Sequence, residues 1–284
     1  MNEVSSATRL AEELATQSIP RSDINDWHLR EFYSALNRHS SAPGSSDPYL
    51  LDDLQAPAAE HDALAVIIET RPHPALALVI DNVINTCHIP VQLFHGSDNL
   101  DFILQSSLKP HINSGQLQLS ALNTAALNAN SYNSLLLNRT FWNSLQTRAK
   151  VLIFQTDALI CQASQYKLSD FFSFDYIGSC WQRERPIGLI IDGGSGGLSL
   201  RDWQLSTQCL QRFAPALWPG GEDGYFAFHM ELIGGKVATQ TEAARFSSQE
   251  WFTDNSFGVH QPQWMSDSDK LKLLAYCPEA GRII

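Results

Sequence analysis

Three parts of the chain hold side chains that could bind a ligand or move a proton. Asp157 follows the apolar run at 150–154, where a carboxylate either binds a metal ion or accepts hydrogen bonds from loop N–H groups. Glu222 and Asp223 form an acid pair after a Gly-Gly turn, and His260 follows a glycine late in the chain. If Asp157 and His260 meet in space, carboxylate oxygen and imidazole nitrogen would suit Mn²⁺ better than Mg²⁺.

The acid pair has two interpretations. Carboxylates in the first turn of a helix are favoured by the helix dipole, so Glu222 and Asp223 could simply start a helix. Alternatively, one of them removes a proton from the hydroxyl of an acceptor substrate.

A glycine-rich segment, GGSGGLSLR at 193–201, is a further candidate. Its glycines permit unusual backbone angles and close approach of a ligand. It is not a phosphate-binding P-loop, because no Gly-Lys-Ser/Thr follows, and it does not match the dinucleotide fingerprint. Arg201 could hold a phosphate or pair with an acid.

These residues must be positioned by a sheet. Four apolar runs predict strands at 63–68, 90–94, 116–120 and 150–155. Helices are predicted between them, at 74–87, 99–107 and 131–147. Strand–helix alternation implies a parallel sheet, whose ligands lie outside the carboxyl ends of the strands. Two of these ends carry polar clusters: Glu69, Thr70 and Arg71, and Gln155, Thr156 and Asp157.

The N-terminal part has a different pattern. Two short helices are expected at 7–19 and 26–38, and SSAPGSSDP at 40–48 has the composition of a linker. We therefore expect residues 1–60 to be a helical appendage and 61–284 to be the main domain.

Composition excludes some classes of function. The chain has 284 residues, is 44% hydrophobic and has a net charge of −11, which argues against general nucleic-acid binding. Five widely spaced cysteines are typical of reduced thiols in a cytosolic protein. No signal peptide or transmembrane run is visible, so a cytoplasmic location is expected.

Taken together, the segments FQTD, FDYIG, GGLSLR, ED and GVH resemble a domain-of-unknown-function family usually grouped with glycosyltransferases. The resemblance covers about residues 62–262. It implies a GT-A-type, Rossmann-like α/β domain, with a mostly parallel sheet flanked by helices. It also implies a hexosyltransferase-like enzyme that moves a sugar from a nucleoside-diphosphate sugar, a UDP-sugar being favoured, to a glycan or other hydroxyl acceptor.

The resemblance extends to individual residues. WPGGEDGYF is similar to a segment of inverting β-galactosyltransferases. This similarity implies two catalytic residues, Asp223 as the base and Glu222 beside it in contact with the acceptor or donor sugar. Asp157 matches the last acid of the Asp-X-Asp metal motif and His260 the late metal-binding histidine, which implies Mn²⁺ or Mg²⁺. The expected nucleotide-sugar contacts are Glu69, Thr70, Arg71, Gln155, Thr156, Gly196, Gly197 and Arg201. The expected acceptor contacts are Trp181 and Trp218, and packing in the core is an equally open alternative for Trp181.

The sequence departs from this pattern at Gln155, which stands where the metal motif has its first acid. This leaves one carboxylate and puts metal dependence in question. A non-catalytic module that binds a sugar nucleotide or glycan is therefore an alternative. A metal-dependent hydrolase that uses Asp157, Asp223 and His260 is a third, although a two-metal site would need more His and Asp residues.

Overall fold

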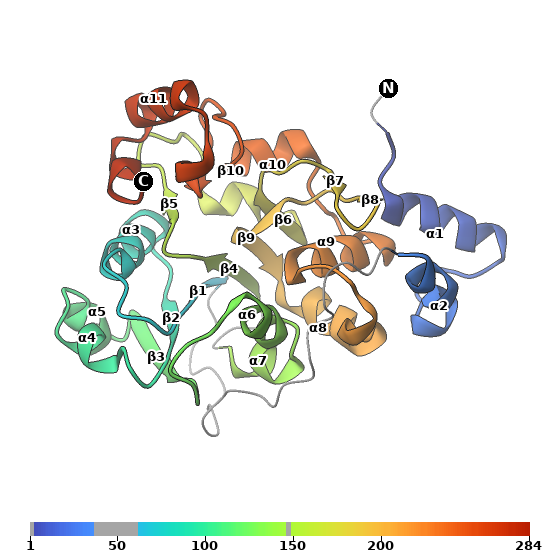
Figure 1. Ribbon diagram of the computed structural model, residues 1–284, viewed down its shortest axis with the longest axis horizontal. Helices are drawn as coiled ribbons and strands as arrows, with labels where there is room; N and C mark the ends of the chain where they lie inside the picture. The colour runs from blue at the N-terminus through green and yellow to red at the C-terminus, as the bar shows by residue number, and fades with distance from the viewer. Residues whose placement is uncertain (1–2, 37–61, 146–148) are drawn as a thin grey trace.

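The computed structural model describes residues 3–36, 62–145 and 149–284. Its centre is a six-stranded sheet with the order β3-β2-β1-β4-β9-β6, in which the first four strands are mutually parallel and β9 is antiparallel to both of its neighbours (Figure 1). The strands are β1 (Ala63–Glu69), β2 (Val91–His95), β3 (Leu117–Ala121), β4 (Lys150–Phe154), β6 (Tyr176–Ser179) and β9 (Ser195–Asp202). The expected α/β class with a mostly parallel sheet is confirmed.

Two smaller sheets extend this framework. One has the order β10-β11-β5, and the other is the β7-β8 hairpin. Their bounds are β5 (Ala158–Ile160), β7 (Glu184–Arg185), β8 (Leu189–Ile190), β10 (Ser247–Ser248) and β11 (Gly258–His260).

Helices cover both faces of the main sheet (Figure 1). In chain order they are α1 (Ser6–Thr16), α2 (Asp26–Ala35), α3 (Leu76–Cys87), α4 (Leu100–Leu104), α5 (Lys109–Ser114), α6 (Ala129–Leu136), α7 (Arg139–Ser144), α8 (Trp203–Arg212), α9 (Glu222–Leu232), α10 (Gln240–Phe246) and α11 (Asp267–Tyr276). Short 3₁₀ helices are η1 (Leu168–Phe171), η2 (Pro215–Leu217), η3 (Pro262–Trp264) and η4 (Pro278–Arg282). In the described part of the chain, every helix is too short or too polar to span a lipid bilayer.

The single helix expected at 131–147 is wrong. Two helices, α6 and α7, lie in this stretch, and residues 146–148 are outside the described ranges. Asn138 causes the break, because its side chain accepts the N–H of Thr140 at 2.8 Å and so caps a new helix.

The strand β1 shows how the sequence builds two cores. All seven of its residues are buried. Leu64, Val66 and Ile68 belong to the hydrophobic cluster that includes α1, α2 and α9, whereas Ala65 and Ile67 belong to the cluster on the opposite face. Successive side chains of a strand point to opposite faces, so a continuous apolar run is what a doubly covered strand requires.

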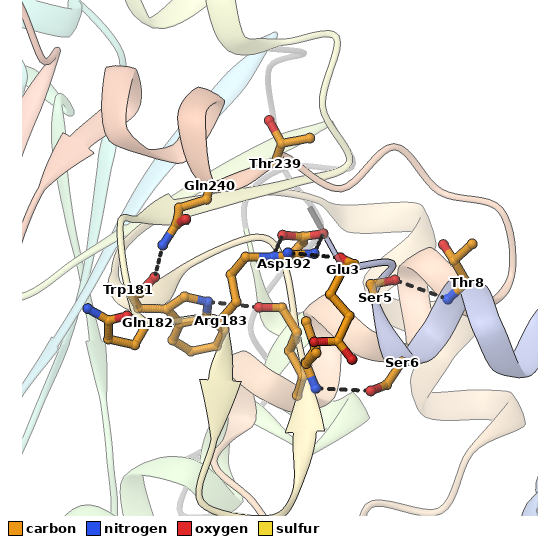
Figure 2. Close-up of polar contacts among 12 residues, drawn as sticks. Glu3, Ser5, Ser6, Thr8, Trp181, Gln182, Arg183, Asp192, Thr239 and Gln240 are labelled. Carbon is orange, nitrogen blue, oxygen red and sulfur yellow. Dashed lines mark hydrogen bonds and ion pairs between the residues drawn. The ribbon is translucent and has the colours of Figure 1, made fainter. Parts of the chain in front are cut away.

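The two N-terminal helices are packed into the first of these cores. Ala7, Ala11 and Leu14 of α1 are buried there. Figure 2 shows the adjacent polar contacts, in which Arg183 donates to the carbonyl of Glu3 and Ser6 Oγ accepts the N–H of Ile190. The expected linker at 40–48 lies outside the described residues, and a boundary at residue 60 stays a prediction.

Candidate active site

The site lies where the strand order reverses. The chain adds β2 and β3 on one side of β1 and then returns to place β4 on the other side. Such a reversal leaves a crevice at the carboxyl ends of the two central strands. Glu69 ends β1, and Gln155 directly follows β4, so the two predicted polar clusters border the same crevice.

Strand β9 brings its glycines to this crevice from the opposite direction. It runs antiparallel to β4 with Leu198 opposite Phe154, so Gly197 lies beside Gln155. A methyl group on Gly197 would lie 2.0 Å from Nε2 of His260, and one on Gly196 would lie 2.3 Å from Glu222 Oε1. These two glycines are therefore required for the other side chains to approach the strand.

The crevice opens into a cavity of about 940 Å³. This volume is in the range of sites that enclose a small-molecule ligand. The structure brings most of the predicted site residues to its lining, namely Glu69, Thr70, Arg71, Gln155, Thr156, Asp157, Gly196, Gly197, Glu222, Asp223 and His260.

One corner of the cavity is suited to a cation. Antiparallel pairing of β11 with β5 places His260 opposite Ala158, next to Asp157. Nε2 of His260 lies 3.4 Å from Asp157 Oδ1 and 3.3 Å from Gln155 Oε1, while Nδ1 lies 2.8 Å from Gln249 Oε1. With Nδ1 donating to Gln249, only a proton or a metal ion on Nε2 can link this nitrogen to the two oxygens.

Gln263 adds an oxygen to the same corner. Its amide N–H donates to Asp157 Oδ2 at 3.4 Å, and its buried Oε1 has no hydrogen-bond partner among the described residues. Burial alone would raise the pKa of Asp157, but contacts with His260 and Gln263 lower it below its ordinary value. No group of three or more His, Cys, Asp or Glu side chains that could hold a metal occurs in ranges 3–36, 62–145 and 149–284.

The two adjacent acids have different surroundings. Glu222 is 4% exposed and forms a bidentate ion pair with the fully buried Arg201, whose second contact measures 3.0 Å. Burial raises the pKa of Glu222, and the charge on Arg201 opposes this rise. Asp223 lines the cavity, and within the described residues its carboxylate accepts only backbone N–H groups, from Gly196 at 3.3 Å and Gly224 at 2.7 Å.

The cluster after β1 forms a second wall. The buried carboxylate of Glu69 accepts from Nε of Arg71 at 2.9 Å and from its terminal nitrogen at 2.8 Å. Glu69 therefore orients the Arg71 guanidinium and is not itself free for a ligand. Thr70 Oγ1 accepts the N–H of Leu127 at 3.1 Å, which ties the segment before α6 to the end of β1.

Three predicted residues are not in the cavity lining. Arg201 is fully buried below it, stacked near the rings of Tyr176 and Phe226. Trp181 and Trp218 are 3% and 0% exposed. Because their indole N–H groups are bonded to carbonyls in the interior, their placement gives no support to the prediction that they contact an acceptor.

The lining also contains residues that the sequence analysis did not identify as site residues, and four polar ones among them are Tyr132, Asn133, Gln263 and Arg282. Asn133 Oδ1 accepts the N–H of Glu222 at 2.9 Å and so holds the first turn of α9 against α6. None of the four lies in a recognisable motif. Gln263 alone had a local signal, because it follows His260 by three residues.

Comparisons with known proteins identify a family and similar folds. The family described as a protein of unknown function, DUF5672, matches residues 116–260. No protein with a curated description matches the sequence. The galactosyltransferase LgtC, solved with donor and acceptor sugar analogues, has a TM-score of 0.50 at 13% identity, over 77% of this chain and 95% of LgtC.

Two further structures are similar. An active-site mutant of LgtC has a TM-score of 0.51 at 13% identity over the same shares of the two chains. The glycosyltransferase GlyE from Streptococcus pneumoniae has a TM-score of 0.45 at 9% identity, over 74% of this chain and 56% of GlyE. The likeness to LgtC supports the GT-A-type fold and nothing finer.

Proposed function

The chain belongs to the DUF5672 family, and we propose that it transfers a sugar from a nucleoside-diphosphate sugar to an acceptor hydroxyl. The observation that carries this proposal is the meeting of Asp157, His260 and Asp223 around one cavity at the reversal point of the sheet. Following the resemblance of the sequence, the favoured donor is a UDP-sugar. We also propose that the protein is cytoplasmic, which fractionation of cells that produce a tagged chain tests.

The donor diphosphate would bind near the cation corner. Asp157, His260 and the Gln155 oxygen fit Mn²⁺ or Mg²⁺, with the unpartnered Oε1 of Gln263 close by. When bound, the cation would offset the charge that develops on the leaving diphosphate. The protein supplies one carboxylate to this corner, so phosphate oxygens of the donor would have to complete the coordination shell of the metal ion.

Asp223 is the carboxylate best suited to take a proton from the acceptor. Of the acids that line the cavity, Glu69 is engaged by Arg71, Glu222 by Arg201, and Asp157 by His260. Asp223 has no ion pair with any residue in the described ranges. It is therefore the acid with lone pairs available to a substrate hydroxyl.

The reaction would be a single displacement. The acceptor hydroxyl gives its proton to Asp223 while its oxygen bonds to the anomeric carbon. The bond from that carbon to the diphosphate breaks, the diphosphate leaves with the electron pair, and the anomeric configuration inverts. Glu222 remains paired and acts by fixing the first turn of α9.

The test combines a ligand panel with one variant. UDP-, GDP-, CMP- and dTDP-sugars are added with and without Mn²⁺, and we measure thermal stabilisation and release of free nucleotide. Asp223→Asn should retain donor binding and lose about 10²–10⁴-fold in turnover, as expected when a positioned base is removed. Asp254→Asn, a change at an exposed acid outside the cavity, should leave turnover unchanged.

The outcomes separate the alternatives. Normal turnover by Asp223→Asn would reject its role as base. Donor binding by the unaltered protein without hydrolysis or transfer would favour the non-catalytic sugar-nucleotide-binding module. Product stereochemistry, read from the anomeric proton by NMR, decides between inversion and retention.

A further inference from the structure

The last residues of the chain form part of the cavity wall. Arg282, Ile283 and Ile284 line it together with the segment that begins α3. In Figure 1 the C-terminus lies beside α11 and β5, on the side of the sheet where α3 is found. This position is held from the interior, since Ala280 is fully buried and Glu279 Oε1 accepts the N–H of Gln162 at 2.6 Å.

Charge in the cavity points to a specific role for this wall. Two of the lining carboxylates, Glu69 and Glu222, are compensated by Arg71 and Arg201. Among the residues that the structure describes, no arginine forms an ion pair with Asp157 or Asp223. Without a bound metal ion, a ligand that carries phosphates would therefore meet a net negative lining, and a positively charged side chain would favour its binding.

Arg282 has such a side chain. It lines the cavity and is exposed, and its guanidinium forms no hydrogen bond or ion pair with any residue in the described part of the chain. Arg71, by contrast, already gives two hydrogen bonds of its guanidinium to Glu69. A guanidinium presents its donors in a planar fork that matches two phosphate oxygens, so an uncommitted arginine in this place suits a phosphate group.

We propose that Arg282 binds the diphosphate of the donor and so makes the C-terminal segment a part of the donor site. This inference rests on the proposed function and extends it to a residue outside the stretch that matches the family. Because the contact is to phosphate, it strengthens binding of a nucleoside diphosphate without affecting binding of the nucleoside alone.

The experiment measures UDP and uridine affinities by calorimetry in the presence of Mn²⁺. Arg282→Gln should weaken UDP binding by about 10–100-fold, the range for a charge-assisted hydrogen bond, and leave uridine binding unchanged. Arg282→Lys should recover part of the affinity, because it keeps the charge and loses the fork. Arg139→Gln is the matched control, since Arg139 is exposed on α7 outside the cavity.

Failure of the inference and failure of the proposed function give different results. If the unaltered protein binds none of UDP, GDP, CDP and dTDP, the proposed function fails. If it binds UDP and Arg282→Gln binds equally well, the role of Arg282 is rejected. An equal loss of UDP and uridine binding in Arg282→Gln would also reject it, because that pattern indicates a disturbed wall and no phosphate contact.

Discussion

Helix α9 is held at its two ends by buried polar contacts of opposite electrical character. Its first turn, at the cavity, is fixed by the ion pair of Glu222 with Arg201. Farther along, His229 accepts the O–H of Tyr33 at 2.8 Å and donates to the carbonyl of Tyr225 at 2.7 Å. The first contact is ionic and the second is neutral, although both are almost fully removed from water.

This difference follows from what each end faces. At the rear, α9 packs against α2 in an apolar core, and a neutral imidazole satisfies both of its nitrogens without a buried charge. At the front, the ion pair commits Glu222 and leaves Asp223 as the available acid of the pair. The two ends should therefore respond differently to loss of a partner and to acid.

The largest expected effect comes from breaking the ionic end. Arg201→Met leaves the Glu222 carboxylate buried and unpaired, and we expect a loss of about 3–5 kcal/mol in the free energy of unfolding. Urea denaturation at pH 7 measures this loss. The double variant Arg201→Met with Glu222→Leu should recover most of it, because it removes both charges. A double variant no more stable than the single one would show that the pair does more than neutralise a buried charge.

A smaller effect, on ligand binding, is expected at Gly197, where strand β9 lies against His260 and Gln155. Gly197→Ala places a methyl group against Nε2 of His260 and Oε1 of Gln155. We expect Mn²⁺-dependent binding of UDP to weaken about 10–100-fold, the usual loss when the orientation of a metal ligand is disturbed. Gly224→Ala is the control, because the nearest atom to its new methyl would be 3.5 Å away. Equal UDP affinities in both variants would show that the position of His260 does not matter for the ligand.

The residues at the cavity could be predicted from the sequence better than the contacts at the far end of α9. Apolar runs such as 63–68 and 150–154 become doubly buried strands, and parallel topology alone brings the polar residues that follow them to one edge. Arg201 was expected to hold a phosphate or pair with an acid. Its partner is Glu222 because α9 packs against β9, and this packing could not be read from the sequence. Neither Arg282 nor the contact of Tyr33 with His229 could be predicted, since each depends on segments that meet only in the folded chain.

The smallest expected effect is also the one that distinguishes the neutral end from the ionic one. Burial lowers the pKa of His229 to about 3, whereas an unfolded histidine has a pKa of about 6.5. Between these values the unfolded chain takes up a proton that the native protein does not. The contribution of the neutral His229 imidazole to the free energy of unfolding is therefore complete above pH 6.5. It is lost progressively as the pH falls toward 3.

At pH 5 the free energy of unfolding is lower by about 2 kcal/mol because of this proton uptake. His229→Gln keeps a donor and an acceptor but cannot titrate, so its stability should fall less than that of the unaltered protein between pH 7.5 and pH 5. Urea denaturation of both proteins across this range measures the difference, and titration of surface groups common to both cancels. Parallel curves would mean that His229 takes up a proton to the same extent in the native and unfolded protein, so that burial does not keep this imidazole neutral.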